Sequence, residues 1–445
     1  MSTELSFNTL EKQVIRAKLC THCGTCEGVC PDDAIQMDDV MGHCLPRLIG
    51  TCSECGACIR CCPGGNVNFS ELTPALPPFD DDGWLGRYRS IWLAHAAKKS
   101  IRLKGASGGI GTALAHYLIR KKHVDAVVTL DFDANMPWIP IVKIISQPDH
   151  IMRAAQSKYF IYPQNRILRI LRNQPVDHVA FFALPCQVHG LRKAIQNNIP
   201  GTEKIRYIIG LYCGNNLYYD ATRSIFRRFG ITDFNRIRSL SYRTGAYPGH
   251  FEVQYDQQRY RLDKFSFNYL SFFFTAFRCL YCTDLANELA DISLGDAWRG
   301  TVTETDIAGT NVVIIRNPEL GEIFQQGIKN DYFVANEISA TEARRMHANV
   351  LSNKKIGAAA RIAWLRRFKR PVPEYDNTQI YISFRRHVLE GFTLVLLRVL
   401  RIRIIRSLSH RISMVLIKPL MQFFRGSWRK QSMKSINKLI SEKTS

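Results

Sequence analysis

The sequence predicts a protein of the α+β / α/β class in three parts: a cysteine-rich N-terminal domain, a mixed α/β core and a basic helical C-terminal extension. Three observations lead to this prediction. A cysteine run is doubled between residues 20 and 63, strand-like and helix-like patterns alternate between residues 88 and 229, and the composition becomes basic after Tyr381. Alternating strands and helices are typical of an α/β sheet. The 445 residues leave room for two or three domains.

The doubled cysteine run is the strongest chemical signal. Each half reads C-x2-C-x2-C-x3-C-P, with a glycine after the second cysteine. The pattern resembles the ferredoxin domain with two 4Fe-4S clusters, in which three cysteines of a run bind one cluster and the fourth binds the other. The glycines let the backbone approach inorganic sulfide, and the prolines turn the chain away. Neither a disulfide scaffold nor zinc knuckles account for triples at this spacing.

The pattern assigns four cysteines to each cluster, within a domain expected at residues 1–72. The first cluster takes Cys20, Cys23, Cys26 and Cys62, and the second takes Cys52, Cys55, Cys58 and Cys30. Cys61 competes with Cys62 for the fourth position, but the proline that follows Cys62 favours Cys62 as the ligand. Cys44 has no assigned role.

A linker is expected at residues 73–87, where three prolines and three successive aspartates do not fit a regular element. Residues 1–19 carry several charges and no long apolar run, so no secretory signal is expected. Iron-sulfur thiolates without an export signal indicate the cytoplasm. Peripheral association with the inner face of the membrane is a further expectation.

The core is expected at residues 88–350. Short apolar stretches predict its strands, and apolar residues at helical spacing predict its helices. The strands are expected at residues 91–96, 124–130, 139–145, 175–183 and 205–211, and the helices at 110–118, 164–173, 187–197 and 218–229. Residues 239–316 favour antiparallel strands, with two candidates at 250–262 and 310–316.

One helix start in the core has the chemistry of a phosphate site. Ser107-Gly108-Gly109 opens a predicted helix directly after a loop, and Thr112 lies one turn further along. Free backbone N–H groups and the positive end of the helix dipole suit a phosphate group. The alternative is an ordinary N-cap with flexible glycines. The spacing does not match the G-x-G-x-x-G fingerprint of a dinucleotide site.

Four cysteines outside the doubled run form a second candidate metal site. Cys186 and Cys213 each follow an apolar predicted strand, at the end where α/β sheets hold their ligands. Cys279 and Cys282 form a lone C-x2-C pair. Together they supply the four thiolates that a third 4Fe-4S cluster needs. Separately, each single cysteine also fits a small buried side chain, and the pair fits zinc or a redox couple.

Eight motifs then occur in one order. They are Ser107-Gly-Gly, Ser157-Lys158-Tyr159, Pro185-Cys-Gln-x2-Gly-Leu-Arg192, Cys213-Gly214, Tyr242-Arg243, Cys279-x2-Cys282, Gly295-Asp296-x-Trp298 and the strand from Gly309 to Arg316. In this order the chain resembles the coenzyme F420 hydrogenase/dehydrogenase beta-subunit family with its N-terminal ferredoxin domain. The resemblance covers residues 15–350. Leu184 departs from the Gly-Thr-Pro-Cys or Gly-Met-Pro-Cys form expected at this motif.

The resemblance implies FAD beside a third 4Fe-4S cluster in the core. Its implied FAD-binding residues are Ser107, Gly108, Gly109, Thr112, Ser157, Lys158, Tyr159 and Gln187, and its implied cluster ligands are Cys186, Cys213, Cys279 and Cys282. Lys158 or Arg243 would steady an anionic reduced flavin or an acidic substrate, unless each is a surface charge. No catalytic residue is assigned.

The function implied by this resemblance is that of an iron-sulfur flavoprotein oxidoreductase. Electrons pass between ferredoxin-type clusters and FAD, which reduces a deazaflavin coenzyme, a pigment or a polysaccharide-related intermediate. The alternative is a non-catalytic subunit that relays electrons to a partner enzyme. A ferredoxin or another redox protein is the expected partner, and a homo-oligomer is a further expectation.

Residues 351–445 are expected to form a basic amphipathic helical tail. The chain has a net charge of +22, and residues 380–445 contribute +12 of it, from 14 Lys and Arg against two acidic residues. The body is therefore not expected to bind nucleic acid. The apolar runs are far shorter than the ~20 residues of a membrane span. A basic amphipathic tail fits an anionic membrane surface, and the alternatives are a structural hairpin, an oligomer contact, or an arm that binds a partner or nucleic acid.

Overall fold

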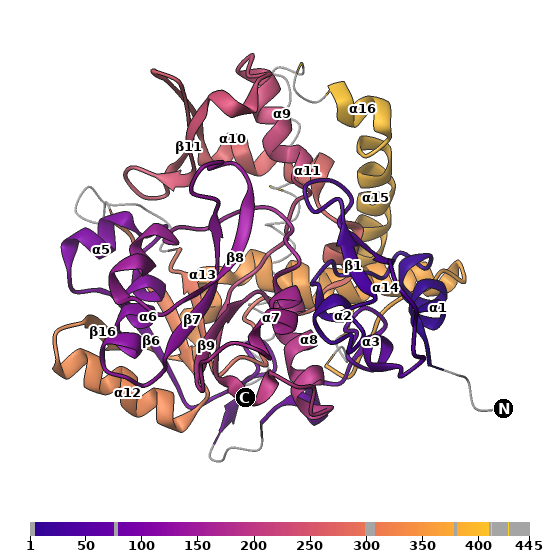
Figure 1. Ribbon diagram of the computed structural model, residues 1–445. Coiled ribbons are helices and arrows are strands. Elements are labelled where there is room, and N and C mark those ends of the chain that lie inside the picture. The colour runs from indigo at the N-terminus through magenta and orange to yellow at the C-terminus, as the bar shows by residue number, and fades with distance from the viewer. Residues whose placement is uncertain are drawn as a thin grey trace.

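The computed structural model describes residues 5–74, 79–298, 308–377 and 381–408, together with Arg411 and Gly426. Its centre is an eight-stranded mixed sheet with the strand order β16-β6-β15-β14-β10-β9-β7-β8 (Figure 1). The strands are β6 (Ser90–Ala96), β7 (Ala126–Phe132), β8 (Pro140–Ile145), β9 (Val179–Ala183), β10 (Ile205–Leu211), β14 (Ile292–Asp296), β15 (Asn311–Ile315) and β16 (Phe333–Glu337). The mixed α/β class predicted from the sequence is confirmed.

The middle of this sheet is parallel and its borders are antiparallel. β9 pairs in parallel with β7 and β10, and β10 pairs in parallel with β14. β15, β6, β16 and β8 are joined by antiparallel pairs. Every residue of β9 is buried, as expected for a strand that is covered on both faces. Because β9 and β10 are parallel, the residues that follow them lie at one edge of the sheet.

Helices cover both faces of the sheet. They are α5 (Lys99–Lys104), α6 (Ile110–Arg120), α7 (Leu168–Leu171), α8 (Pro185–Gln196), α12 (Pro318–Lys329) and the 3-10 helices Pro148–Arg153, Gln164–Ile167 and Thr202–Lys204. Phe182 packs in one core with side chains of α6 and α12, while its neighbour Phe181 packs in another with α7 and α8. This alternation follows from the pleat of the strand, whose successive side chains point to opposite faces.

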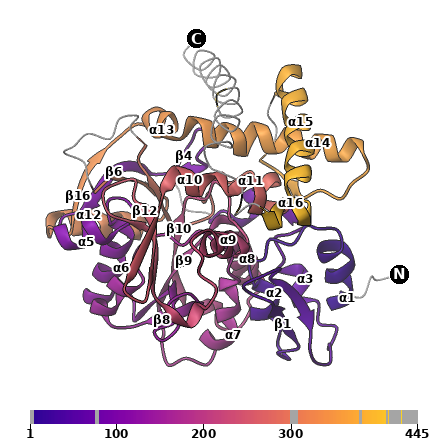
Figure 2. The same cartoon turned by 90° about the horizontal axis from the view of Figure 1, so that it is seen from above.

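The N-terminal domain packs against the second of these faces. It contains α1 (Phe7–Leu10), a π-helix (Glu11–Ile15), α2 (Thr25–Gly28), the antiparallel pair β1 (Ile35–Asp38) and β2 (Leu45–Leu48), α3 (Ala57–Arg60), β3 (Asn66–Val67) and α4 (Phe69–Leu72). In both views α2 lies beside α8 (Figures 1 and 2). Buried Glu27 pairs with Arg166 of the core at 3.0 Å. Val67 and Phe69 join the apolar core beneath the sheet, so the domain is firmly attached.

A second, smaller sheet and its helices form a separate unit. It consists of the antiparallel strands β11 (Ile237–Thr244), β12 (His250–Tyr255) and β13 (Gln258–Asp263), with α9 (Asp220–Arg228), α10 (Lys264–Tyr269), α11 (Ser271–Phe274) and the 3-10 helix Phe234–Arg236. The single strand expected at residues 250–262 is wrong, because the chain turns at Asp256 and forms a hairpin. The strand expected at 310–316 is β15, which belongs to the main sheet.

The expected linker is partly regular. Asp80–Asp81 (β4) pairs antiparallel with Arg87–Tyr88 (β5), so the absence of regular structure predicted for residues 73–87 is wrong for this stretch. The Asp82 carboxylate accepts hydrogen bonds from the backbone N–H groups of Trp84 and Leu85. A side-chain acceptor of this kind stabilises a tight turn, and here it brings the two short strands together.

The C-terminal part is helical, as predicted, and it is packed against the body. It contains α13 (Ala340–Ser352), a π-helix (Asn353–Gly357), α14 (Ala358–Arg367), β17 (Glu374–Tyr375), α15 (Phe384–Leu400) and α16 (Arg403–Leu408). β17 pairs in parallel with β3 of the N-terminal domain. Glu390 of α15 is fully buried and bonds Arg361 at 2.6 Å and Arg386 at 2.8 Å.

Part of the expected tail cannot be compared with the structure. Its apolar residues Met414, Val415, Leu416, Leu420, Phe423, Phe424 and Trp428 lie outside the described residues. Among the helices of the described ranges, none is both long and apolar enough to cross a membrane.

Candidate functional site

The cysteines assigned to the first cluster lie together. Burial raises the pKa of the Cys26 thiol well above its usual value, and the charges of Cys20, Cys23 and Cys62 raise it further. The N–H of His22 points to Cys20 Sγ at 3.4 Å, and the N–H of Gly64 points to Cys62 Sγ at 3.3 Å. Each of these two N–H groups therefore donates to a sulfur of this group.

The cysteines assigned to the second cluster also form one group, nearer the surface. Burial raises the pKa of the Cys58 thiol to about 12, with further contributions from Cys52, Cys55 and Cys30. Cys55 is exposed and Cys52 is partly exposed, whereas Cys23 and Cys26 of the other group are buried. The second group therefore reaches the surface at Cys55, whereas no cysteine of the first group is exposed.

Cys61 and Cys62 point in different directions. Cys61 is fully buried in the apolar core beneath the sheet, with Val67 and Val188. Cys62 lies instead in the cluster of side chains that includes Cys20 and Cys26. Cys44 is buried beside this group, and its carbonyl oxygen is 2.8 Å from Nδ1 of His22.

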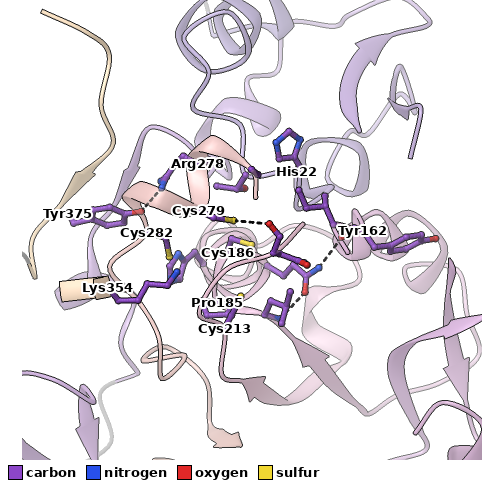
Figure 3. Close-up of a pocket in the computed structure, with 17 residues that line it drawn as sticks. His22, Tyr162, Pro185, Cys186, Cys213, Arg278, Cys279, Cys282, Lys354 and Tyr375 are labelled. Atoms are coloured by element: carbon purple, nitrogen blue, oxygen red, sulfur yellow. Dashed lines mark hydrogen bonds between the residues drawn. The ribbon is translucent and has the colours of Figure 1, made fainter. Parts of the chain in front are cut away.

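The four remaining candidate cysteines line one cavity (Figure 3). Cys186 is the second residue of α8 and follows β9, while Cys213 follows β10. Cys279 and Cys282 come from the 3-10 helix Phe277–Tyr281 and the residue after it. We call this space, with the four thiols around it, the cysteine cavity. Residues Thr21 and His22, from the first ferredoxin turn, also line it.

The thiols of the cysteine cavity influence one another and the ferredoxin domain. Burial raises the pKa of Cys186 well above its usual value, and Cys23 is the next largest cause, ahead of Cys213, Cys279 and Cys282. In the described ranges no three His, Cys, Asp or Glu side chains are spaced to hold a single metal ion. Four cysteine thiolates are the donor set that a 4Fe-4S cluster requires.

Two buried cations border the cysteine cavity. Lys354 is only 2% exposed and its ammonium has no hydrogen-bond partner among the described residues. Burial lowers the pKa of Lys354, but the charges of Cys282, Cys213 and Cys279 outweigh it and raise the pKa overall. Arg278 donates to the carbonyl oxygens of Pro63 and Gly64 at 3.3 and 3.2 Å, and so joins the cavity to the ferredoxin domain.

Gln187 lies at the cysteine cavity. Its Oε1 accepts the N–H of Leu184 at 2.8 Å, and its Nε2 donates to the carbonyl oxygen of Tyr162 at 3.0 Å. The side chain therefore closes the start of α8, away from the other residues expected to bind FAD. His189, from the next part of α8, also borders this cavity and bonds Asp284 at 2.9 Å.

A larger cavity of about 410 Å³, which we call the large cavity, lies beside the start of α6. Five of the residues expected to bind FAD line it: Ser107, Gly109, Thr112, Ser157 and Tyr159. Gly108, Lys158 and Gln187 do not line it. The structure thus brings together the two motifs Ser107-Gly-Gly and Ser157-Lys-Tyr, which are far apart in the sequence.

The glycine pair shapes the wall of the large cavity. Gly108 and Gly109 have φ values of +59° and +73°, which glycine adopts without steric cost. The N–H of Gly108 donates to the carbonyl of Ala308 at 2.8 Å, and a Cβ on Gly108 would lie 2.5 Å from Asn311 Oδ1. Gly108 therefore brings the loop close to β15, while Gly109 begins α6 at the cavity.

The two cations expected to face the flavin are engaged with protein groups. Lys158 donates to the carbonyls of Ala154, Ala155 and Gln156 at 2.6, 3.3 and 3.3 Å, and burial lowers its pKa to about 8. The three residues that accept these bonds line the large cavity, so Lys158 stabilises the cavity wall without lining the cavity itself.

Arg243 is buried and has a similar role. It donates to Asp296 Oδ2 at 2.8 Å, to the Tyr159 hydroxyl at 3.0 Å and to the carbonyl of Ala106 at 2.7 Å. Each of these three acceptors belongs to a residue of the cavity wall. The guanidinium therefore ties three segments of the wall together.

Two cavity residues were missed in the sequence. Lys264 is buried, lines the large cavity and has its ammonium 3.4 Å from the centre of the Tyr159 ring. His347 lines the same cavity, with its ring 5.0 Å from that of Tyr212. Neither residue belongs to a motif, and a lysine after Asp263 is typical of an ordinary helix start. Only the tertiary structure places the two residues at the site.

The two cavities share a wall. Cys213 lines the cysteine cavity, and the next two residues, Gly214 and Asn215, line the large cavity. The first ferredoxin turn, the cysteine cavity and the large cavity therefore follow one another in space. The order of the three is set by the carboxyl end of β10 and by the packing of the ferredoxin domain on α8.

Three family descriptions match the chain. Residues 91–169 match the N-terminal part, and residues 176–341 the C-terminal part, of the coenzyme F420 hydrogenase/dehydrogenase beta subunit. Residues 14–36 match the 4Fe-4S binding domain. Together they cover the first of the two cysteine runs and the four cysteines of the cysteine cavity.

Named relatives agree with this family. The chain is 25% identical over 386 residues to the coenzyme F420-dependent sulfite reductase of Methanocaldococcus jannaschii, covering 84% of this chain but only 53% of that protein. It therefore spans about half the length of that relative. It is 24% identical over 294 residues to the coenzyme F420 hydrogenase subunit beta of Methanosarcina barkeri, covering 62% of this chain and 91% of the relative.

A solved structure shares the fold. It is a chain from the F420-reducing [NiFe] hydrogenase complex of Methanosarcina barkeri, with a TM-score of 0.53 and 21% identity, and the match covers 66% of this chain and 98% of that chain. The family matches cover both halves of the core, and the 4Fe-4S match covers the start of the cysteine run. The chain thus belongs to the coenzyme F420 hydrogenase/dehydrogenase beta-subunit family, a family of iron-sulfur oxidoreductases, and carries an N-terminal 4Fe-4S domain.

Proposed function

We propose that this protein is an iron-sulfur flavoprotein oxidoreductase. In this proposal electrons move from two N-terminal 4Fe-4S clusters through a third cluster in the cysteine cavity to FAD in the large cavity. One observation carries the proposal: the first ferredoxin turn borders the cysteine cavity, and the cysteine cavity shares the wall Cys213–Asn215 with the large cavity. Such contiguity is what a short electron-transfer path requires.

The cysteine cavity has the charge balance that an anionic cluster needs. Burial of an ammonium without an acceptor is costly, and an anion beside it removes much of that cost. Lys354 is such an ammonium, and Arg278 adds a second positive charge. A cluster bound by Cys186, Cys213, Cys279 and Cys282 is anionic and supplies one-electron transfer. The residues of the cavity therefore fit the group.

The large cavity offers a phosphate site at one end and a cation further in. The first turn of an α-helix leaves backbone N–H groups without intrahelical acceptors, and α6 begins at the cavity wall. We assign the FAD pyrophosphate to this end, beside Ser107, Gly109 and Thr112. A bound flavin converts one-electron steps into two-electron chemistry. Lys264 holds a positive charge over the Tyr159 ring and would stabilise an anionic reduced flavin there.

We propose a deazaflavin coenzyme as the electron acceptor or donor. The relatives named after coenzyme F420 support this choice over a pigment or a polysaccharide-related intermediate. Trp298 lies at the large cavity and is 37% exposed, with its ring 5.5 Å from that of Tyr247. Aromatic rings of this kind offer a stacking surface to a planar coenzyme.

A ferredoxin or another redox protein is the partner that we propose, and it docks near Cys55. Of the cysteines assigned to clusters, Cys55 is the exposed one, so electrons would enter or leave at the second group. Reduced thiolate ligands favour the cytoplasm as the compartment. The competing function is a relay subunit, in which FAD passes electrons to a partner enzyme.

Cofactor content tests the proposal. Protein purified without oxygen is expected to hold about twelve irons and one FAD per chain. Cys186→Ser should lower the iron content by about four and leave the ferredoxin clusters detectable by electron paramagnetic resonance. Unchanged iron in that variant would remove the third cluster from the proposal.

A second variant tests the flavin site separately. Thr112→Glu places a carboxylate in the large cavity near the end of α6 assigned to phosphate, so flavin should be lost while iron stays constant. Thr112→Ser keeps the hydroxyl and should retain flavin. Gly108 is unsuitable for this test, because its Cβ would overlap Asn311 whether or not FAD binds there.

Turnover separates an enzyme from a relay subunit. The purified chain is mixed with a reduced ferredoxin and oxidised coenzyme F420, and the absorbance of the coenzyme is followed. Reduction of the coenzyme by this chain alone supports the enzyme. Reduction of the bound flavin without turnover of the coenzyme would favour the relay subunit.

A further inference from the structure

The helix α15 has two apolar sides, and only one of them is covered by the body. Leu394 and Leu397 are 5% exposed and pack inward. On the opposite side Phe384, Val388, Val395 and Val399 are 45–81% exposed. These four recur at intervals of four or seven residues, so they share one side of the helix. We call them the outer face of α15.

The charged groups around the outer face are positive. Arg385 and Arg398 of α15 are exposed. The acidic residue of α15, Glu390, is fully buried between Arg361 and Arg386 and presents no charge to solvent. Among the described residues of α14 and α15, the exposed charges are therefore all cationic.

A basic cluster extends this surface at the end of α14. It consists of Arg366, Arg367, Lys369 and Arg370, all exposed, around Phe368, which is 64% exposed. The cluster precedes α15 and was not part of the basic region from residue 380 onward that the sequence composition marks. It adds four positive charges and one aromatic side chain beside the outer face.

Packing holds the basic cluster and the outer face in one rigid arrangement. The Trp364 ring of α14 stacks on Phe368 at 5.9 Å and on His387 of α15 at 5.3 Å. Its Nε1 donates to the carbonyl of His387 at 2.6 Å. A Cβ on Gly391 would overlap the same ring, so the two helices touch where they cross (Figure 2).

We propose that the outer face of α15 and the basic cluster of α14 bind the surface of an anionic lipid bilayer. An in-plane helix buries apolar side chains at the boundary of the head groups, and neighbouring Lys and Arg side chains bind anionic lipid. Charge decides between lipid and a second copy of this chain. A symmetric contact through this face would bring its positive charges together, whereas an anionic bilayer is complementary to them.

The proposed surface leaves the redox site accessible. None of its residues lines the cysteine cavity or the large cavity. The protein can therefore bind a bilayer through α14 and α15 while both cavities keep their own surroundings. This inference is independent of the proposed cofactors, because it rests on the exposure and charge of another part of the molecule.

Vesicle sedimentation of the full chain tests the proposal. The protein is expected to sediment with equimolar phosphatidylcholine–phosphatidylserine vesicles and to remain in solution with phosphatidylcholine vesicles alone. Each basic side chain near an anionic surface strengthens binding by roughly fivefold, and salt weakens this contribution. Replacing all four basic residues of the α14 cluster by Gln should lower the lipid partition coefficient by at least roughly tenfold.

The apolar part has its own matched pair of variants. Val395→Asp removes an outer-face valine and adds a negative charge, and should weaken binding by roughly tenfold. Val334→Asp changes a valine of similar exposure on β16, and should leave binding unchanged. Iron content and the visible spectrum of each variant report whether the body is intact.

Three results would overturn the proposal. Equal sedimentation with neutral and anionic vesicles would remove the role of the basic cluster. Absence of sedimentation with anionic vesicles at low salt would exclude a lipid bilayer as the binding partner. A dimer in analytical ultracentrifugation that dissociates on Val395→Asp, without lipid binding, would assign the outer face to a second copy of the chain.

Discussion

The ferredoxin-type cysteines lie in one short stretch from Cys20 to Cys62, whereas those of the cysteine cavity are spread from Cys186 to Cys282. In the first group, tight turns place thiols three residues apart around a common point, so the spacing in the sequence is enough to identify the site. In the second group, two parallel strands end side by side and a separate 3-10 helix closes the cavity. The comparison teaches that the same ligand chemistry can be built locally or by tertiary structure.

The two groups also differ in their surroundings. The ferredoxin group reaches the surface at Cys55, and Lys193 donates to the carbonyl oxygen of Cys62 at 3.0 Å. The cysteine cavity instead has the buried ammonium of Lys354 against its thiols. Positive charge beside a cluster favours the reduced form, so the two groups are expected to differ in reduction potential.

The largest expected effect concerns the ligands of the local group. Cys62→Ser should lower the iron content by about four per chain, because it removes a thiolate that faces Cys20 and Cys26. Cys61→Ser should keep the iron, because Cys61 packs in the apolar core. Iron analysis and electron paramagnetic resonance of both variants check this prediction. The reverse result would exchange the roles of these neighbouring residues.

The next effect concerns the contact between the two groups. A Cβ on Gly28 would overlap the carbonyl oxygen of Asn165, so Gly28→Ala should push the ferredoxin domain away from the core. Overpacking of this kind costs about 1–3 kcal/mol, which should lower the thermal unfolding midpoint. Electron transfer from the ferredoxin clusters to the core should also slow, as measured by rapid mixing.

Gly65→Ala is the matched control for this prediction. A Cβ on Gly65 would meet no atom within 4 Å, so both stability and electron transfer should stay near the wild-type values. Equal behaviour of the Gly28 and Gly65 variants would mean that the close approach of α2 to the core has no energetic role.

The smallest expected effect is a change in reduction potential without loss of a cofactor. Lys354→Met should lower the reduction potential of the cluster that we propose for the cysteine cavity by on the order of 100 mV, because a nearby positive charge no longer stabilises the reduced form. Iron content and the potentials of the ferredoxin clusters should not change. Lys354→Arg keeps the charge and should stay closer to wild type. A redox titration followed by electron paramagnetic resonance that shows no shift for Lys354→Met would exclude this role.

Local patterns made much of the fold predictable. The apolar stretches that became β9 and β10 and the helical spacing of α6 and α8 were recognised, because strands buried on both faces and amphipathic helices have a periodicity visible in a short window. The hairpin of β12 and β13 and the pairing of β4 with β5 were not. Both depend on turns at aspartates, which the hydrophobic pattern does not describe.

The sequence by itself determined the doubled ferredoxin run and the family, since both rest on residues at fixed spacing. Only the tertiary structure decided which side chains meet at the cavities. It turned Gln187 toward Tyr162 and Lys158 toward three carbonyls, although both had been expected to contact FAD. It also brought Lys264 and Lys354 to the cavity walls. Their positions depend on packing between distant segments, and a lysine carries no local pattern that distinguishes a buried site from a solvated surface.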